Sequence, residues 1–235
     1  MIDAIILAGG FGTRLREAVP NVPKPLAPIN GVAFLDLLIE QIERAEVVKK
    51  IILAIGYKAD LICEHFSKRK GKIPIAFSTE EKPLGTGGAV RKAIALSDSA
   101  QVLVLNGDSY LECSLTEMVD QFHAPMTMAY TRVDDAGRFG QVVVDPQGWI
   151  KAFREKEAKQ SSGCINGGIY LFERKIFDRK WPEIFSLEKE MFPQLLYEGI
   201  YGFQTKGLFI DIGTPESFAF AQTILKTNQQ STKTS

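Results

Sequence analysis

The sequence predicts an α/β protein with a mainly parallel sheet and a second half that is richer in strands. Three observations support this class. In the first half, short apolar runs alternate with segments of helical periodicity, which is typical of strand–helix–strand units. The apolar runs are continuous, as expected of strands that are buried on both faces of a sheet. After about residue 110, strand-like segments predominate.

The first half is expected to begin and end with a strand. Strands and helices should alternate at 3–8, 33–46, 49–55, 58–67, 73–78, 87–97 and 101–105. Right-handed crossovers bring such strands into one parallel sheet, and ligands bind beyond their carboxyl ends. The loop Gly9–Arg14 and the tripeptide Asn106-Gly107-Asp108 both follow strands in this way. We therefore expect both segments to lie at a binding site.

The second half is expected to contain four strands, a helix, a strand pair and a final helix. In order, these span 125–132, 139–145, 148–153, 165–172, about 187–198, near 200–212, and about 215–227. We expect a single domain over 1–227, with halves of about 1–110 and 111–227. Residues 228–235 are Asn, Gln, Ser, Thr and Lys, a composition typical of a disordered tail.

Composition and charge limit the classes of function. The 235 residues include 28 Lys and Arg and 28 Asp and Glu, whereas a nucleic-acid binder usually has a basic excess. Cys63, Cys113 and Cys164 form no C-x-x-C pair, which indicates packing residues in a reducing cytoplasm. The sequence shows neither the basic segment of a signal peptide nor an apolar run of roughly 20 residues that could span a membrane. We therefore expect a cytoplasmic protein that binds neither nucleic acid nor membranes.

A glycine loop follows the first strand directly. Gly9, Gly10 and Gly12 let backbone N–H groups approach an anion closely, and Arg14 and Lys24 add positive charge beside them. The sequence therefore predicts that this loop binds phosphate.

The loop differs from two familiar nucleotide-binding loops. A Rossmann fingerprint requires a third glycine where Leu15 stands, and the next strand ends at Ile55-Gly56-Tyr57 without an acidic residue. A Walker A loop has no match, since Gly71-Lys72 is followed by Ile73. The sequence therefore supports neither NAD binding nor ATP hydrolysis by a P-loop.

A second glycine motif, Leu84–Ala89, follows a strand and opens a helix. Helix N-termini present free N–H groups and a partial positive charge, which favour anions. A simple turn before a helix is the alternative. Three glycines in four positions favour a nucleotide that lies flat against the backbone.

Two aspartates, Asp108 and Asp211, lie beside apolar strand-like runs. Strand alternation places Asp211 on the face opposite Ile210 and Ile212. Either aspartate could cap a turn or bind a ligand. Together with a phosphate loop they predict Mg²⁺, which favours one or two carboxylates plus substrate phosphates.

Three other features have ordinary structural interpretations. Glu155-Lys156 is typical of a solvated pair, and Asn166-Gly167-Gly168 of a β-bulge or turn. His65 and His123 have no neighbours at metal-ligand spacing. From these residues alone, we expect structural roles.

The motif Leu7–Leu15, followed by Pro23-Lys24-Pro25, resembles the signature of the sugar-1-phosphate nucleotidyltransferases. Later motifs of that family are matched in order at 84–89, 106–108, 155–156, 166–168 and 211–214. The resemblance covers residues 3–226. It implies a three-layer α/β/α fold of the GT-A-like type, with a nucleotide-binding first half and a sugar-binding second half. It also implies a Mg²⁺-dependent reaction, in which a sugar 1-phosphate oxygen attacks the α-phosphorus of an NTP and pyrophosphate leaves.

The resemblance also implies roles for individual residues. Arg14 would hold the departing β,γ-phosphates, Lys24 would neutralise charge at the reacting phosphates, and Asp108, with Asp211, would hold Mg²⁺. The nucleotide would contact Leu7, Gly9, Gly10, Gly12, Thr13, Glu80, Gly85, Thr86, Gly88 and Asn106, with Glu80 near the base or ribose. The sugar phosphate would contact Gly107, Glu155, Lys156, Asn166, Gly167 and Glu188. Glu188 has a comparable interpretation as a first-turn acid that interacts with the helix dipole.

Within the family, the chain is most similar in detail to the D-glycero-α-D-manno-heptose 1-phosphate guanylyltransferases. The shared segments are 22–29, 55–59, 83–89 and 185–190. Arg16-Glu17-Ala18-Val19 departs from the P-x-T that follows the loop in many members, which argues against the common glucose-1-phosphate thymidylyl- and uridylyltransferases. Whole-chain similarity therefore favours GTP and a heptose 1-phosphate, in a surface-polysaccharide pathway.

Several alternatives stay open at this point. The chain could be a mannose-1-phosphate guanylyltransferase, or a uridylyl- or thymidylyltransferase that acts on another sugar. A catalytically silent nucleotide-sugar sensor is an alternative of another class. A sensor could lose the charged residues of the site, whereas Arg14, Lys24, Asp108 and Asp211 are all present. An enzyme is therefore favoured, and homo-oligomer formation is left open.

Overall fold

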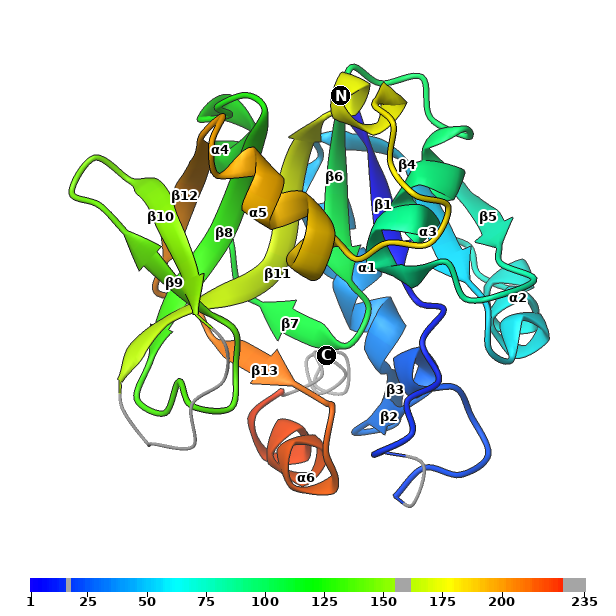
Figure 1. Cartoon of the computed structure of the whole chain (residues 1–235). Coiled ribbons are helices and arrows are strands. Elements are labelled where there is room, and N and C mark those ends of the chain that lie inside the picture. Colours follow the sequence, from blue (N-terminus) through cyan, green and yellow to red (C-terminus); the bar gives the residue numbers. More distant parts are fainter. Residues whose placement is uncertain (16–17, 155–161, 226–235) are drawn as a thin grey trace.

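The computed structural model describes residues 1–15, 18–154 and 162–225, and its centre is one mixed sheet of nine strands (Figure 1). Across the sheet, the order is β5-β4-β1-β6-β11-β8-β12-β10-β9. The bounds are Ile2–Leu7 (β1), Val48–Ile55 (β4), Ile75–Thr79 (β5), Gln101–Asn106 (β6), Met126–Val133 (β8), Gln141–Val144 (β9), Trp149–Arg154 (β10), Gly163–Glu173 (β11) and Ile200–Thr205 (β12). Strands β10 and β11 run opposite to the others in this sheet.

The helices of the first half lie where the sequence predicts them, to within a few residues. The α-helices are Phe34–Ala45 (α1), Ala59–Ser67 (α2), Gly85–Ile94 (α3), Leu115–Asp120 (α4), Phe192–Leu195 (α5) and Pro215–Ile224 (α6). The helix predicted at about 187–198 is instead a π-helical turn, Leu187–Met191, followed by the short α5. Short elements that no prediction covers are α4, the hairpin Pro28–Ile29 (β2) with Val32–Ala33 (β3), strand Ser109–Leu111 (β7), and 3₁₀ turns at Lys24–Leu26 and Arg174–Asp178.

Helices cover both faces of the sheet, because the strands of its parallel part send apolar side chains to both sides. Along β1, Ala4 and Ile6 face one apolar core and Ile5 faces the other. Helices α1, α2, α4 and α6 contribute to the first core, and α3 and α5 to the second. The three-layer α/β/α arrangement is thereby confirmed (Figure 1).

Strands from both parts of the chain share the central sheet. Strands β1, β4, β5 and β6 form its parallel side, and β8 to β12 form the rest. The division of the domain at about residue 110 stays a prediction. The predicted tail, 228–235, lies outside the described residues.

Both strands predicted near 200–212 are present, but they do not pair with each other. Strand β12 joins the central sheet parallel to β8, whereas Phe209–Asp211 (β13) pairs with Ser109–Leu111 (β7) in a separate small sheet. Between β12 and β13, a Cβ on Gly207 would lie 1.9 Å from the Glu112 carbonyl oxygen, so the chain passes very close to another backbone there. Two strands separated by a few residues that include glycine are typical of a hairpin, and the local sequence does not show the change of sheet.

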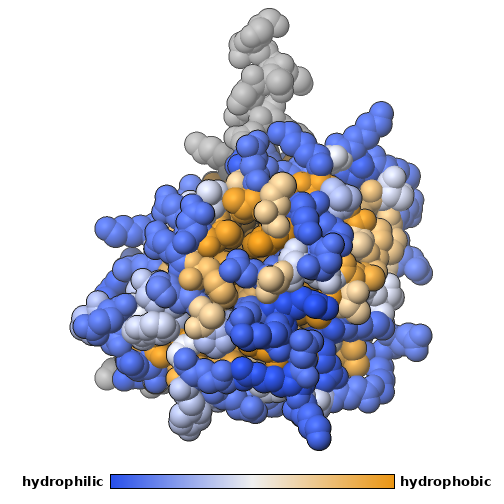
Figure 2. All heavy atoms as spheres, turned by 90° about the horizontal axis from the view of Figure 1, so that it is seen from above, coloured by the Kyte–Doolittle hydropathy of each residue, from blue (hydrophilic) through white to orange (hydrophobic). Residues whose placement is uncertain are grey.

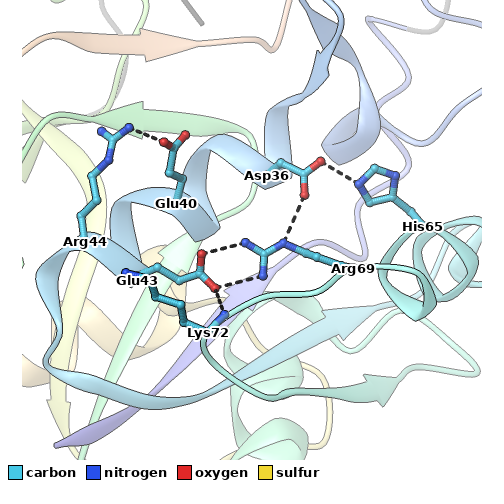
Figure 3. Close-up of polar contacts among 7 residues, drawn as sticks. All are labelled: Asp36, Glu40, Glu43, Arg44, His65, Arg69 and Lys72. Atoms are coloured by element: carbon cyan, nitrogen blue, oxygen red, sulfur yellow. Dashed lines mark hydrogen bonds and ion pairs between the residues drawn. The ribbon is translucent and has the colours of Figure 1, made fainter. Parts of the chain in front are cut away.

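A polar network joins α1 to the segment that follows α2 (Figure 3). The Arg69 guanidinium donates to both carboxylate oxygens of Glu43, at 3.1 and 2.9 Å, and the Lys72 backbone N–H donates to the same carboxylate at 2.9 Å. Beside them, a ring nitrogen of His65 lies 2.7 Å from Asp36. The hydrogen bonds from Arg69 hold the pKa of Glu43 below its usual value.

We expect Arg69→Met to lower the free energy of unfolding by about 1–2 kcal/mol at pH 7, because it removes the charged partner of a largely buried carboxylate. Since the pKa of Glu43 is lowered on folding, this stabilisation is present above the unfolded-state pKa and is lost as pH falls through the folded-state pKa. Urea denaturation should therefore show a smaller loss at pH 3 than at pH 7. Arg44→Met, which removes an exposed pair with Glu40 on the same helix, is the control, with a loss below about 0.5 kcal/mol. Equal losses for Arg69→Met at both pH values would contradict this account.

Figure 2 shows the end of the molecule at which β1 begins. Hydrophobic residues are exposed near the centre of this face, and hydrophilic side chains surround them. Exposed apolar areas can mark contacts with other molecules, and homo-oligomer formation stays a prediction. Among the described residues, no helix combines the length and the apolar character needed to cross a bilayer.

Candidate active site

A cavity of about 440 Å³ opens where β1 and β6 end. It is bounded by the glycine loop after β1, the start of α3 and the tripeptide at the end of β6. The sequence-predicted residues that line it are Leu7, Gly9, Gly10, Gly12, Thr13, Arg14, Lys24, Glu80, Gly85, Thr86, Asn106, Gly107, Asp108 and Glu188. The fold therefore brings most of the predicted site residues to one cavity.

No motif assigns a site role to several other residues of the lining. They are mostly apolar or small, namely Phe11, Pro25, Ala54, Pro83, Ala89 and Gly213. Such residues suit the flat, apolar wall that a nucleobase requires. In the sequence, however, an apolar residue at the end of a strand or the start of a helix is indistinguishable from a core residue.

The glycine loop packs directly on the segment that carries Lys24. Gly12 has a φ of +57°, and a Cβ there would lie only 2.8 Å from the Cβ of Lys24. Lys24 begins the 3₁₀ turn Lys24–Leu26, in which Pro23 and Pro25 restrict the backbone. The lysine is therefore held beside the loop that we expect to bind phosphate.

Lys24 forms an ion pair with Asp108 across the cavity. Lys24 Nζ lies 2.7 Å from Asp108 Oδ2, and the two side chains are 11% and 47% exposed. In this arrangement the two charges neutralise each other. Because the pair lies beside the glycine loop, a phosphate would give the lysine a new partner and leave the carboxylate available for a cation.

Asp211 reaches the same end of the molecule through the β7–β13 pair. It lies opposite Ser109 in that pair, and the Ile212 N–H donates to the Asp108 carbonyl oxygen at 3.0 Å. Asp211 Oδ1 accepts from the Gly213 N–H at 2.9 Å. Gly213 lines the cavity, whereas Asp211 lies next to that lining.

Two neighbouring aspartates fit Mg²⁺ when phosphate oxygens supply further ligands. The described part of the chain contains no group of three or more His, Cys, Asp or Glu side chains that could hold a metal alone. Binding of Mg²⁺ at Asp108 and Asp211 stays a prediction.

Glu188 connects the π-helical turn to the start of α3. Its Oε2 accepts hydrogen bonds from the hydroxyls of Thr86 and Ser186, both at 2.8 Å. Ser186 also caps the turn by accepting from the Glu188 backbone N–H at 3.1 Å. Glu188 thus occupies the first turn of the helix, as the helix-dipole interpretation predicts. It also lines the cavity, as a contact with the sugar phosphate requires.

Glu80 is half-buried in the wall of the cavity. The Leu84 N–H donates to Glu80 Oε2 at 3.3 Å, and burial raises the pKa of the Glu80 carboxyl group. The carboxylate is thereby held in a fixed position in the wall.

The structure does not bring every predicted residue to the cavity. Gly88 is buried, and its N–H donates to the Phe185 carbonyl oxygen at 3.2 Å. This contact gives Gly88 a packing role at the start of α3. Glu155 and Lys156 lie outside the described residues, and their predicted contacts with the sugar phosphate stay predictions.

Asn166 and Gly167 belong to an irregularity in β11 and do not line the cavity. The pairing register with β8 shifts between Asn166 and Tyr170, which confirms the β-bulge interpretation. Asn166 Oδ1 accepts from the Gly168 N–H at 2.9 Å, inside the bulge. Sugar contacts for Asn166 and Gly167 stay predictions.

The sequence matches known proteins along nearly its whole length. The family model described as nucleotidyl transferase matches residues 3–228. The chain is 37% identical over 226 residues to D-glycero-alpha-D-manno-heptose 1-phosphate guanylyltransferase of Aneurinibacillus thermoaerophilus, covering 94% of this chain and 97% of that protein. It is also 37% identical over 227 residues to mannose-1-phosphate guanylyltransferase of Mycobacterium tuberculosis, covering 92% of this chain but 62% of that protein.

A solved structure agrees with these relationships. HddC from Yersinia pseudotuberculosis, in complex with GMP-PN, superposes with a TM-score of 0.87 at 35% identity, covering 96% of this chain and 100% of that one. The resemblance of the motifs to the sugar-1-phosphate nucleotidyltransferases is therefore confirmed at the level of sequence and fold. The chain belongs to the nucleotidyl transferase family.

Proposed function

We propose that this protein transfers GMP from GTP to D-glycero-α-D-manno-heptose 1-phosphate, producing GDP-heptose and pyrophosphate. The observation that carries the proposal is a cavity in which the glycine loop, Arg14 and the Lys24–Asp108 pair lie together. The similarity to a heptose 1-phosphate guanylyltransferase over 94% of the chain supports the choice of sugar. The GMP-PN complex of HddC supports the choice of nucleotide.

In this mechanism, the chain positions the phosphates and neutralises their charge. The backbone N–H groups of the glycine loop and Arg14 bind the β- and γ-phosphates, which leave as pyrophosphate. Lys24 leaves its ion pair with Asp108 and contacts the phosphates instead. Its positive charge then lowers the repulsion between the attacking sugar phosphate and the α-phosphate. Asp108 and Asp211 would hold Mg²⁺, which supplies Lewis-acid polarisation of phosphate oxygens when it is bound. Positioning of the two substrates supplies much of the remaining acceleration.

Glu80 offers a chemical basis for choosing guanine. A carboxylate accepts two hydrogen bonds side by side, and the guanine edge presents two such donors, N1–H and the 2-amino group. Uracil and thymine present only one N–H donor on the corresponding edge. A carboxylate held in the cavity wall therefore supports GTP over UTP and dTTP.

We expect Glu80→Gln to lower kcat/KM for GTP by about tenfold and to raise the ratio of UTP to GTP activity, because one acceptor oxygen becomes an N–H donor. Steady-state rates with each nucleotide measure that ratio. Glu81→Gln, at the exposed neighbouring position, is the control and should leave the ratio unchanged. An unchanged ratio in Glu80→Gln would remove Glu80 from base recognition.

Mannose 1-phosphate is the second candidate acceptor, because the relative from Mycobacterium tuberculosis shows the same 37% identity. The heptose phosphate is preferred because the chain covers nearly all of the heptose enzyme but only 62% of the mannose enzyme. We further propose that the reaction takes place in the cytoplasm and supplies surface-polysaccharide synthesis.

Pyrophosphate release tests the proposed function. The assay crosses GTP, ATP, CTP, UTP and dTTP with heptose, mannose and glucose 1-phosphates, with and without Mg²⁺. We expect the highest rate with GTP, the heptose phosphate and Mg²⁺. A higher rate with another pair would replace the substrates but keep the reaction class. A chain that releases no pyrophosphate with any pair would instead support the nucleotide-sugar sensor.

A further inference from the structure

At the cavity, the carboxylate of Glu188 has partners on only one of its two oxygens among the described residues. Glu188 lines the cavity and is exposed. Its Oε2 accepts from the hydroxyl groups of Thr86 and Ser186, each at 2.8 Å. Across the described ranges, Glu188 forms no ion pair, and Oε1 accepts no hydrogen bond. One oxygen is thus held in place while the other keeps its acceptor positions for a ligand.

The helical turn that contains Glu188 is capped without this carboxylate. The Ser186 hydroxyl oxygen accepts from the backbone N–H groups of Glu188 and Lys189 at 3.1 and 3.2 Å. The Ser186 N–H donates to the carboxylate of Glu190 at 2.6 Å. These contacts satisfy donors at the start of the turn, as an N-cap residue does. The Glu188 carboxylate is therefore available for a role other than capping.

The hydroxyl of Thr86 is committed to the Glu188 segment. It donates to Glu188 Oε2 and accepts from the Leu187 backbone N–H, both at 2.8 Å. A hydroxyl group has a single hydrogen, so this hydrogen is not available to a nucleotide phosphate. Thr86 therefore holds the Glu188 carboxylate instead of donating to a ligand itself.

Backbone contacts fix the same segment on the start of α3. The Phe185 carbonyl oxygen accepts from the N–H groups of Gly87 and Gly88 at 2.9 and 3.2 Å. A Cβ on Gly87 would lie 2.2 Å from the Phe185 ring, so the ring packs directly on the helix. Because both sides of the contact between Thr86 and Glu188 are held in this way, the carboxylate has a defined position at the cavity.

The charge of Glu188 and its free oxygen indicate the chemistry of the ligand. A carboxylate repels phosphate oxygens and accepts hydrogen bonds from donors. Since Oε2 already has two donors, the two oxygens cannot together take the paired N–H donors of guanine, whereas single hydroxyl groups can donate to Oε1. Both substrates of the proposed reaction carry ring hydroxyls, the sugar 1-phosphate on its sugar and GTP on its ribose.

We propose that Glu188 Oε1 accepts hydrogen bonds from ring hydroxyl groups of a bound substrate, and that Thr86 is the positioning residue that holds the Glu188 carboxylate for this contact. The inference rests on the proposed function, since it takes the two substrates of that reaction as the sources of the hydroxyls. Thr86 then acts through Glu188, whereas the family resemblance implies that Thr86 contacts the nucleotide.

Steady-state kinetics test both roles. In Glu188→Ala, we expect KM for one of the two substrates to rise at least about tenfold, because a charged acceptor is lost. Thr86→Val removes the hydroxyl but keeps the shape of the side chain, and should raise the same KM by about three- to tenfold. Thr86→Ser restores the hydroxyl and should return that KM to within about twofold of the wild-type value. Unchanged KM values for both substrates in Glu188→Ala would overturn the proposal.

Two substitutions control for structural effects. Glu190→Ala removes another acid of the same turn, and Thr116→Val removes a threonine hydroxyl that donates to the Ala45 carbonyl oxygen at 3.0 Å. Neither substituted residue lines the cavity, so both variants should leave both KM values unchanged. A rise in Glu190→Ala equal to that in Glu188→Ala would assign the effect to the turn and overturn the proposal.

Substrate analogues identify the source of the hydroxyls. A rise in KM for the sugar 1-phosphate alone places them on that sugar, and a rise in KM for GTP alone places them on the ribose. Deoxy sugar 1-phosphates, 2′-deoxy-GTP and 3′-deoxy-GTP then each remove one hydroxyl. The analogue that lacks a contacted hydroxyl should lose kcat/KM with the wild-type chain but nothing further with Glu188→Ala. Losses that multiply for every analogue would show that Glu188 contacts no ring hydroxyl.

The series uses the sugar 1-phosphate and nucleotide with which the wild-type chain is most active. A best acceptor other than the heptose phosphate would overturn the proposed function without affecting this comparison. Conversely, full activity with the heptose phosphate and unchanged constants in Glu188→Ala would overturn only the inference. For a chain that is inactive with every pair, calorimetric titration with GTP and each sugar 1-phosphate replaces kinetics. Equal affinities in wild type and Glu188→Ala would then overturn the inference.

Discussion

Asp108→Asn is expected to lower kcat by on the order of 10²-fold or more, with a change in Tm of less than about 4 °C. The carboxylate lies beside the glycine loop and pairs with Lys24 at 2.7 Å, while Asp211 approaches from the adjacent strand of the small sheet. Asparagine keeps the size and one acceptor oxygen but loses the charge that a divalent cation requires. The fold should therefore persist while the charge balance at the reacting phosphates is lost.

Asp98→Asn is a matched control for this substitution. Asp98 also pairs with a lysine, Lys49, at 2.7 Å, but on the exposed surface away from the cavity. Its replacement should leave kcat unchanged. Binding of Mn²⁺ in the presence of GTP, followed by electron paramagnetic resonance, gives a second readout and should weaken only in Asp108→Asn. Near-normal turnover and Mn²⁺ affinity in Asp108→Asn would show that Asp108 is not a metal ligand.

Lys24→Met is the second substitution expected to have a large effect, with kcat falling by about 10²-fold and KM for GTP rising. The lysine side chain is 11% exposed and is held by the proline-flanked turn against the glycine loop. Methionine fills a similar volume, so the packing at Gly12 should be preserved. What is lost is the positive charge that we expect to contact the reacting phosphates.

Thermal unfolding and kinetics together distinguish the two possible roles of Lys24. Lys49→Met removes the lysine of the exposed pair and should change neither kcat nor KM. If Lys24→Met lowered Tm markedly and preserved turnover, the lysine would be structural. Lys24→Arg should recover part of kcat, because it restores the charge but not the geometry of a compact ammonium group.

The parallel part of the fold could be predicted from the sequence because each of its strands is buried on both faces. Continuous apolar runs such as Ile51–Ile55 have that signature, and β4 includes this run. The face of Asp211 was also predictable, since Ile210 and Ile212 are buried as strand alternation requires. The start of helix α4 could also have been predicted, because Ser114 is a favourable N-cap residue. In the structure its side chain accepts a hydrogen bond from the Glu117 N–H.

Contacts between distant segments could not be predicted in the same way. Lys24 and Asp108 are 84 positions apart, and their ion pair depends on the packing of the glycine loop on the 3₁₀ turn. The two strands near 200–212 could not be assigned to different sheets for the same reason, because the partner of β13 lies about a hundred residues earlier, in β7.

The measurement that tests the central claim most directly is identification of the product formed from GTP and D-glycero-α-D-manno-heptose 1-phosphate in the presence of Mg²⁺. Mass spectrometry and ³¹P NMR spectroscopy should show GDP-heptose and pyrophosphate in equal amounts, with a rate for Asp108→Asn lower by on the order of 10²-fold or more. Consumption of neither substrate, while another nucleotide and sugar 1-phosphate react readily, would contradict the assignment of GTP and heptose.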